Sequence, residues 1–130
     1  MENPSTLRDA SLSGIRPQLN LDTSQSGELE RFQHEVLRPL LKFQHPILVR
    51  QFQAFLIEFK QNLDSVDSNQ TRSYIQHVLK THKRLRATYF GQLTGLMTDA
   101  EFGFYLQHRG EINKRLTQML IQRLESHWCR

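Results

Sequence analysis

Residues 46–63 read PILVRQFQAFLIEFKQNL, and this stretch has the clearest hydrophobic period in the chain. Its apolar residues recur every three or four positions and fall within a narrow arc of a helical wheel: Leu48, Phe52, Phe55, Leu56, Phe59 and Leu63. Proline is well suited to the first position of a helix, so we expect a break at His45-Pro46. The pattern predicts an amphipathic helix over residues 46–63.

The segments on either side also have a helical period and weak strand signals. We expect a helix over residues 27–44, kinked or split at Pro39, and another over residues 70–93. A last helix begins at Thr98, where TDAE fits a capping box, and continues to about residue 128. Four amphipathic helices with short connections predict an all-α fold, an antiparallel bundle of about four helices.

Residues 1–26 differ from the rest because they are rich in Ser, Thr, Asn, Gly and Pro, with scattered apolar residues. We expect an irregular N-terminal arm, flexible or partly docked, ahead of a helical domain over residues 27–130. The length of 130 residues suits one domain with one core.

The composition indicates a cytoplasmic protein without a membrane partner. No apolar run approaches the roughly 20 residues that span a bilayer, and we see no cationic stretch followed by an apolar one at the N-terminus. The single cysteine, Cys129, excludes an internal disulfide framework and fits a reducing compartment.

Positive charge is concentrated in one part of the chain. The net charge is only +4, but residues 68–98 contain no Asp or Glu. The stretch 79–90, LKTHKRLRATYF, supplies most of the cations in that window. Such asymmetry favours an anionic partner.

On a helical wheel of residues 70–93, Lys80 and Arg84 point away from the apolar sector and Lys83 lies at its flank, as on a solvated face. His82 falls at the centre of that sector, and Arg86 falls well inside it. Burying a charge alone is costly, so Arg86 either reaches water or a carboxylate, or it meets an anion from outside. The alternative to ligand binding for His82 is a neutral core histidine bonded to a backbone carbonyl.

Arg109 stands in a similar position among the apolar residues of the last predicted helix. Glu101, two turns earlier, could pair with Arg109 or with Arg86, which would make a structural ion pair. The competing interpretation is a cleft in which both arginines bind phosphate, with Tyr89 and Tyr105 as a surface for stacking a base.

The last predicted helix has a second apolar side. Its members are Gly103, Leu106, Gly110, Ile121, Leu124 and Trp128. Glycines inside a helix cost about 1 kcal/mol each, which suits a close approach of another helix. We favour a homodimer through this side, and the alternative is a central helix of a monomer.

Catalytic and metal-binding motifs are missing, so we expect no enzyme activity, no cofactor and no metal. The six histidines form no His-x3-His or Glu-x-x-His motif, and Glu30 with His34 is only a weak hint of a metal site. There is no phosphate-binding glycine loop and no nucleophile elbow.

Three functions compete. The first is a regulatory module that binds a phosphate-bearing small ligand, such as a cyclic dinucleotide, through Arg86, Arg109, Lys83 and the tyrosines. The second is an adaptor for an acidic protein, and the third is a helical protein that binds nucleic acid through Lys80, Lys83 and Arg84. Arginines in apolar sectors favour the first.

Overall fold

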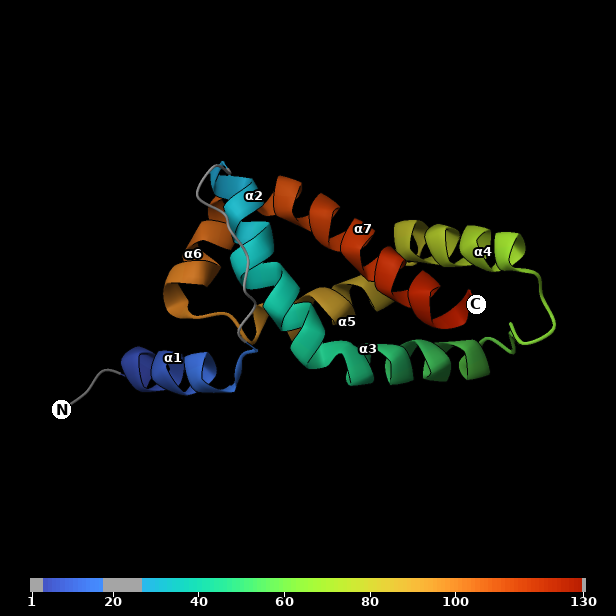
Figure 1. Cartoon of the computed structure of the whole chain (residues 1–130), viewed down its shortest axis with the longest axis horizontal. Coiled ribbons are helices and arrows are strands. Elements are labelled where there is room, and N and C mark those ends of the chain that lie inside the picture. The colour runs from blue at the N-terminus through green and yellow to red at the C-terminus, as the bar shows by residue number, and fades with distance from the viewer. Residues whose placement is uncertain (1–3, 18–26, 130) are drawn as a thin grey trace.

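The computed structural model describes residues 4–17 and 27–129, and all regular structure in them is helical. The elements are α1 (Pro4–Ile15), α2 (Glu28–Phe32), the π-helix η1 (Gln33–Leu37), α3 (Arg38–Glu58), α4 (Ser68–Thr81), α5 (Lys83–Thr94), α6 (Asp99–Gln107) and α7 (Arg109–Trp128). The predicted all-α class is confirmed. The described residues form six helical segments rather than about four: α2, η1 and α3 are continuous (Figure 1), the last two predicted helices are each divided in two, and α1 is an additional helix.

The predicted break at Pro46 is wrong, since Pro46 lies inside α3. A proline inside a helix costs about 3 kcal/mol, because it removes one hydrogen bond and crowds the preceding turn. Leu41 before it and Leu48 after it are both buried in one core, and this burial holds the helix together across the proline. Figure 1 shows that α3 changes direction midway along its length.

A π-helical turn stands where we expected the kink at Pro39. The Arg38 amide donates to the carbonyl of Gln33, five residues back, and η1 ends directly before Arg38. Pro39 itself has no amide to donate, so the irregular turn comes immediately before the residue that cannot continue the regular hydrogen-bond pattern.

The predicted helix over residues 70–93 is interrupted at His82. This residue has an extended backbone (φ −86°, ψ 91°), and its Nδ1 accepts a hydrogen bond from the Leu85 amide at 3.2 Å. Its ring packs edge-on against Phe55 and Phe59, with centroids 4.8 and 5.4 Å away. His82 therefore ends α4 and caps α5, which changes the direction of the side chains that follow.

The last predicted helix is also interrupted, at His108 (φ −123°, ψ 28°). The capping box at its start is confirmed, because Thr98 and Glu101 exchange hydrogen bonds as predicted. The ring of His108 lies 4.4 Å from that of Phe104, so the side chain packs back on α6 while the backbone turns into α7.

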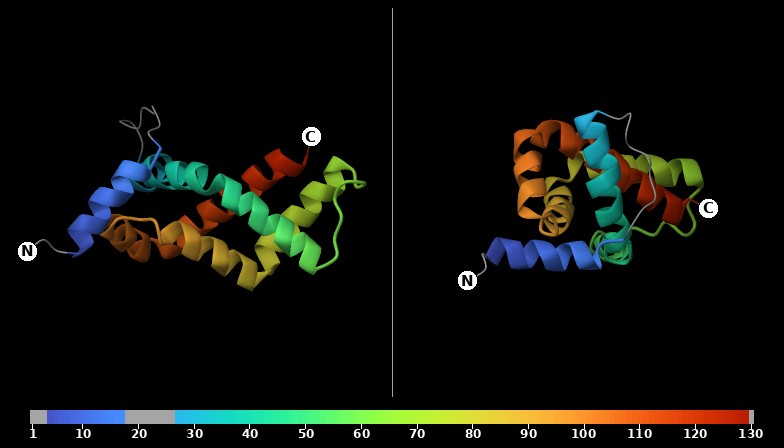
Figure 2. Two further views of the ribbon diagram at one scale, coloured as in Figure 1. Left: turned by 90° about the horizontal axis from the view of Figure 1, so that it is seen from below. Right: turned by 60° about the vertical axis from the view of Figure 1, so that its left-hand side comes forward.

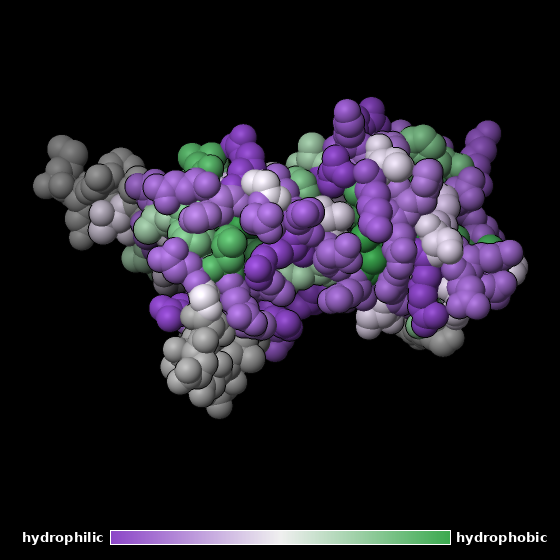
Figure 3. All heavy atoms as spheres, turned by 90° about the horizontal axis from the view of Figure 1, so that it is seen from above, coloured by the Kyte–Doolittle hydropathy of each residue, from purple (hydrophilic) through white to green (hydrophobic). Residues whose placement is uncertain are grey.

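The core lies between α3, α4, α5 and α7, and its fully buried members come from all four helices. They include Phe52, Leu79, Tyr89, Leu116 and Leu120. The helices cross in several directions (Figure 2), and a regular antiparallel bundle is not confirmed. Hydrophilic residues cover most of the face drawn in Figure 3.

The N-terminal segment is helical over Pro4–Ile15, which differs from the irregular arm that we expected. Arg8 donates to the carbonyls of Gly95 and Met97 at 2.6 and 2.7 Å, and the Asp99 amide donates to Asp9 at 3.0 Å. α1 is thereby held against the loop between α5 and α6 (Figure 2). Residues 18–26 of the predicted arm lie outside the described residues.

Candidate anion-binding groove

Arg86, in α5, contacts the C-terminal end of the preceding helix, α4. Its Nη1 donates to the carbonyl of Lys80 at 3.0 Å and more weakly to that of Leu79 at 3.4 Å. The last carbonyls of a helix carry partial negative charge, and arginine commonly binds them. α4 itself supplies these acceptors, the predicted carboxylate partner of Arg86 is not present among the described residues, and the role of Arg86 in ligand binding stays a prediction.

Arg109 is exposed on the surface, where its guanidinium carbon lies 5.7 Å from the centroid of the Tyr105 ring. Tyr105 is buried, and its hydroxyl donates to Asn113 at 2.7 Å. The break at His108 separates Arg109 from the apolar stripe to which we assigned it. Arg109 therefore makes a cation–π contact at the start of α7.

Tyr89 cannot stack a base in this structure. Its side chain is fully buried, its hydroxyl donates to the Leu48 carbonyl at 3.1 Å, and burial raises the pKa of the phenol. The predicted stacking role of Tyr89 is wrong, since the tyrosine fills the core between α3 and α5.

Glu101 pairs with a residue that we did not consider. Arg16 donates to its two carboxylate oxygens at 2.6 and 2.8 Å, and this replaces the predicted pairs with Arg86 or Arg109. Burial alone would raise the pKa of Glu101, but hydrogen bonds from Arg16 and Thr98 and the charge of Arg16 outweigh it, so the pKa is lowered.

The three basic residues assigned to a solvated face, Lys80, Lys83 and Arg84, are exposed. Arg84 lies 3.4 Å from Glu58 in an ion pair whose side chains are both largely in water. Such pairs contribute little to stability. His82 serves as the cap described above, with its Nδ1 occupied.

The six residues of the predicted dimer interface do not share one face. Three of them are exposed, namely Gly103, Leu106 and Gly110. Ile121 and Leu124 are buried in the core, and the Trp128 ring packs 5.1 Å from that of Phe52. The premise of one continuous helix fails at His108, which turns the two halves apart. An interface on α6 remains a prediction.

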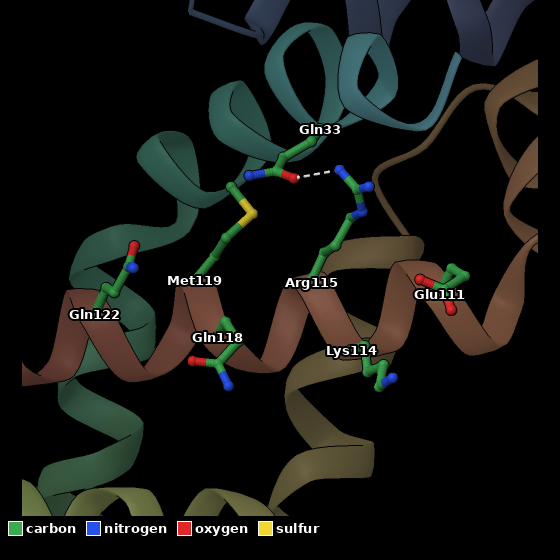
Figure 4. A pocket seen from close by; sticks show the side chains of 7 residues that line it. All are labelled: Gln33, Glu111, Lys114, Arg115, Gln118, Met119 and Gln122. Atoms are coloured by element: carbon green, nitrogen blue, oxygen red, sulfur yellow. Dashed lines mark hydrogen bonds between the residues drawn. The ribbon is translucent and has the colours of Figure 1, made fainter. Parts of the chain in front are cut away.

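A different set of basic residues lines a groove between η1–α3 and α7. It consists of two adjoining hollows of about 320 and 290 Å³, which share Met119 and Gln122. Its basic side chains come from both walls: Arg38, His45, Lys114, Arg115 and Arg123. Figure 4 shows Arg115 and Met119 extending from α7 toward Gln33 on η1. We call this the α3–α7 groove.

At one end of the groove, Arg123 and His45 are in contact, with Nη1 and Nδ1 3.2 Å apart. A guanidinium cannot accept a hydrogen bond, so Nδ1 of His45 is the acceptor and the ring is neutral. Burial, and then the charges of Arg123 and His127, lower the pKa of His45. Burial and the charge of Arg38 likewise lower the pKa of Arg123, so this end concentrates positive charge.

The other arginines of the groove also bind neutral groups. Arg38 Nε donates to His34 Nδ1 at 2.9 Å, and Arg115 Nη1 donates to Gln33 Oε1 at 2.8 Å. Among the described residues, Arg38, Arg115 and Arg123 form no ion pair. A guanidinium has five N–H donors, so one bond to a neutral group leaves room for phosphate or carboxylate.

No protein-family model, curated protein or solved structure matches the chain at a significant level.

Within the part of the chain that the structure describes, no helix is long and apolar enough to cross a bilayer. The same residues contain no group of three His, Cys, Asp or Glu side chains that could hold a metal ion. The weak metal hint at His34 is replaced by its hydrogen bond with Arg38.

The sequence analysis missed the groove because its residues are far apart along the chain. Arg38 and Arg123 come from different helices and stand outside the acid-free window. One signal was present in α7, where Arg115, Met119 and Arg123 follow one another at intervals of four residues on one helical face.

Proposed function

We propose that the protein is a non-enzymatic regulatory module that binds a phosphate-bearing small ligand in the α3–α7 groove. The observation that carries the proposal is the set of three arginines, Arg38, Arg115 and Arg123, whose described partners are neutral. Arginine forks match the oxygens of phosphate, and the repulsion between Arg38 and Arg123 would be relieved by an anion between them.

A nucleotide is the ligand class that best combines phosphate with further hydrogen-bonding groups, and a nucleotide second messenger such as a cyclic dinucleotide belongs to this class. Gln118 and Gln122 supply amides beside the cations. We therefore assign the proposed binding function to α3 and α7 rather than to the residues around Arg86. A reducing, cytoplasmic setting is part of the proposal, on the strength of the single cysteine.

The test is isothermal titration calorimetry and thermal shift with a nucleotide panel that includes cyclic dinucleotides. Binding should weaken at least tenfold in Arg123→Gln, because a hydrogen bond between charged groups is lost. Arg84→Gln is the matched control, since Arg84 is exposed and outside the groove, and its affinity should equal that of the wild type. No thermal shift with any nucleotide at millimolar concentration would overturn the proposal.

Homodimer formation is a second part of the proposal. The exposed residues Phe102 and Leu106, with Gly103 between them, form an apolar surface on α6 on which a second copy would pack. Light scattering after size exclusion should show a dimer that Leu106→Glu dissociates. A monomer in the wild type at high protein concentration would refute this part.

An adaptor function is the second candidate because α3 exposes an apolar stripe. Phe43, Ile47 and Ile57 are 40, 49 and 72% exposed and lie on one face of the helix. An adaptor would bind its partner through this stripe, and Lys80 and Lys83 would pair with acidic groups of the partner. A pull-down should then lose its partner in Ile47→Glu and keep it in Arg123→Gln, which is the reverse of what ligand binding predicts. A gel shift at low salt with the same two variants tests the binding of nucleic acid.

A further inference from the structure

The α3–α7 groove has two cationic ends rather than one cluster. Arg115 and Arg123 are eight residues apart on α7, which corresponds to about two turns and about 12 Å along the helix axis. Each hollow contains one of them, and only Met119 and Gln122 line both. A compact anion at Arg123 would not reach Arg115.

The two ends are fixed by different parts of the opposite wall. Gln33 on η1 holds Arg115, and His45 on α3 holds Arg123. The chain therefore runs in the same direction along both walls of the groove. The hydrogen bonds keep the two guanidinium groups apart, so an occupant that uses both must be extended.

The floor between the ends is suited to a flat ring. The thioether of Met119 is polarisable and makes favourable contacts with aromatic rings. Gln118 and Gln122, four residues apart on α7, are exposed and offer amide donors and acceptors along the edge of this floor. Glutamine amides match the donor–acceptor edges of nucleobases.

We infer that the occupant of the α3–α7 groove is a linear oligonucleotide, with one phosphate at Arg123, another at Arg115 about 12 Å further along the helix axis, and bases over the floor between them. The inference rests on the proposed function, since it assumes that the groove binds phosphate. A dinucleotide is too short for this, because its two phosphates are only one nucleotide apart. A stacked strand advances about 3.4 Å per nucleotide, so the strand would need about four phosphates to span the groove.

Glu111 also lines the hollow that contains Arg115 and opposes an anion at that end. Its carboxylate makes the Arg115 end the weaker of the two. The Arg123 end, with Arg38 and His45 beside it, then binds the first phosphate, and the Arg115 end adds affinity only for ligands that reach it.

The experiment measures the affinity of adenosine 5′-monophosphate and of 5′-phosphorylated linear di- and tetra-adenylate by titration calorimetry. The proteins are wild type, Arg115→Gln, Arg123→Gln and Glu111→Gln, each checked for an unchanged melting temperature. Arg115→Lys keeps the charge and serves as a second variant if Arg115→Gln does not fold.

Arg123→Gln should weaken all three ligands by about tenfold or more, whereas Arg115→Gln should do so only for ligands that span the groove. Glu111→Gln should tighten those same ligands. Because the two phosphates of the dinucleotide are about 3.4 Å apart along a stacked strand, Arg115→Gln should weaken the tetranucleotide and leave the dinucleotide unchanged; an equal loss with the dinucleotide would contradict the spacing of about 12 Å.

The inference is overturned if Arg115→Gln leaves every affinity within twofold while Arg123→Gln weakens them. That result would leave the proposed function intact, with a single-phosphate site. If none of the three ligands binds the wild type, the inference fails, and the proposed function then depends on the nucleotide panel, so the two failures are distinguishable.

Discussion

Replacing Arg16 with methionine should detach α1 while the rest of the fold stays intact. Arg16 Nη1 and Nη2 bind the two oxygens of Glu101 at 2.6 and 2.8 Å, and Nη2 also reaches the Leu96 carbonyl at 3.0 Å. The other described side-chain bonds of α1 to the body of the protein come from Arg8 and Asp9. Leu7 and Ile15 on α1 are more than half exposed, so apolar burial adds little.

The size of the effect follows from the burial of the pair. The side chains of Arg16 and Glu101 are 12 and 20% exposed, so they are mostly but not fully removed from water. Hydrogen bonds between charged groups are worth about 1.5–3 kcal/mol, and breaking a fully buried pair costs about 3–5 kcal/mol. We expect about 2 kcal/mol here, since Glu101 keeps its capping bonds to Thr98 after the change.

Native-state hydrogen exchange measures this directly. A loss of about 2 kcal/mol of docking free energy should speed exchange of the α1 amides roughly thirtyfold and leave the α7 amides unchanged. Arg8→Met is the matched control, and it should have a smaller effect because Arg8 is about half exposed. If the α1 amides of Arg16→Met exchange within twofold of the wild-type rate, Arg16 is not the main contact that holds α1 against the rest of the protein.

The same contact predicts a pH dependence. The pKa of Glu101 is lowered below its ordinary value of 4.5 in the folded protein, so the unfolded or undocked state takes up a proton first as the pH falls. The stabilisation is therefore complete above pH 4.5 and is lost as the pH drops through the folded pKa. The protection factors of the α1 amides, which are corrected for the intrinsic pH dependence of exchange, should therefore fall over that acidic range in the wild type but not in Arg16→Met.

Four further predictions concern other parts of the molecule. The lowered pKa of His45 means that the unfolded state binds its proton first, so stability should fall as the pH drops below about 6.5, and His45→Asn should flatten that fall in urea titrations. Gly103→Ala should stabilise the monomer by about 1 kcal/mol, because an added methyl meets nothing within 4 Å, and should weaken a dimer that packs there; Gly91→Ala, equally open, should change stability alone. Tyr89→Phe should cost about 1 kcal/mol in denaturant unfolding through its lost hydrogen bond, and an unchanged midpoint would contradict the role of the hydroxyl. Arg86→Gln should cost about 1 kcal/mol of stability and leave nucleotide affinity unchanged, whereas loss of binding with intact stability would restore Arg86 as a ligand residue.

The hydrophobic period predicted the core of α3 well. Leu48, Phe52, Phe55 and Leu56 are buried as expected, because their spacing alone places them on one side of a helix. Phe59 is 44% exposed instead, since α3 ends at Glu58 and the arc no longer applies to the residue after it. Local spacing therefore sufficed wherever the helix continued.

The helix boundaries depended on contacts that a local pattern does not contain. Pro46 is a strong breaker by itself, yet burial on both sides of it keeps α3 continuous. His82 and His108 carry no local stop signal, yet both interrupt helices; the ring of His82 packs on Phe55 of α3, whereas that of His108 packs on Phe104 one turn earlier and does not explain the break. Tertiary packing thus overrode propensity in both directions, and every wheel drawn across these points misplaced the residues beyond it.

The arginines show why a charge in an apolar sector is a poor guide to a ligand. A helix end carries about half a negative charge on carbonyls that lack partners, and a long arginine side chain reaches them without leaving the surface of its own fold. Arg86 does this at the end of α4, and Arg8 does so just beyond α5. Charge in residues 68–98 is therefore partly neutralised by the helices themselves.

The arginines of the α3–α7 groove differ because the groups that hold them are neutral. A bond to a glutamine or histidine orients a guanidinium without cancelling its charge, so the repulsion between Arg38 and Arg123 persists in the free protein. An anion that removes this repulsion binds more tightly by the same amount. Replacing His45 by aspartate should therefore stabilise the free protein and weaken nucleotide binding at once, and an increase of both would refute the groove as the site of anion binding.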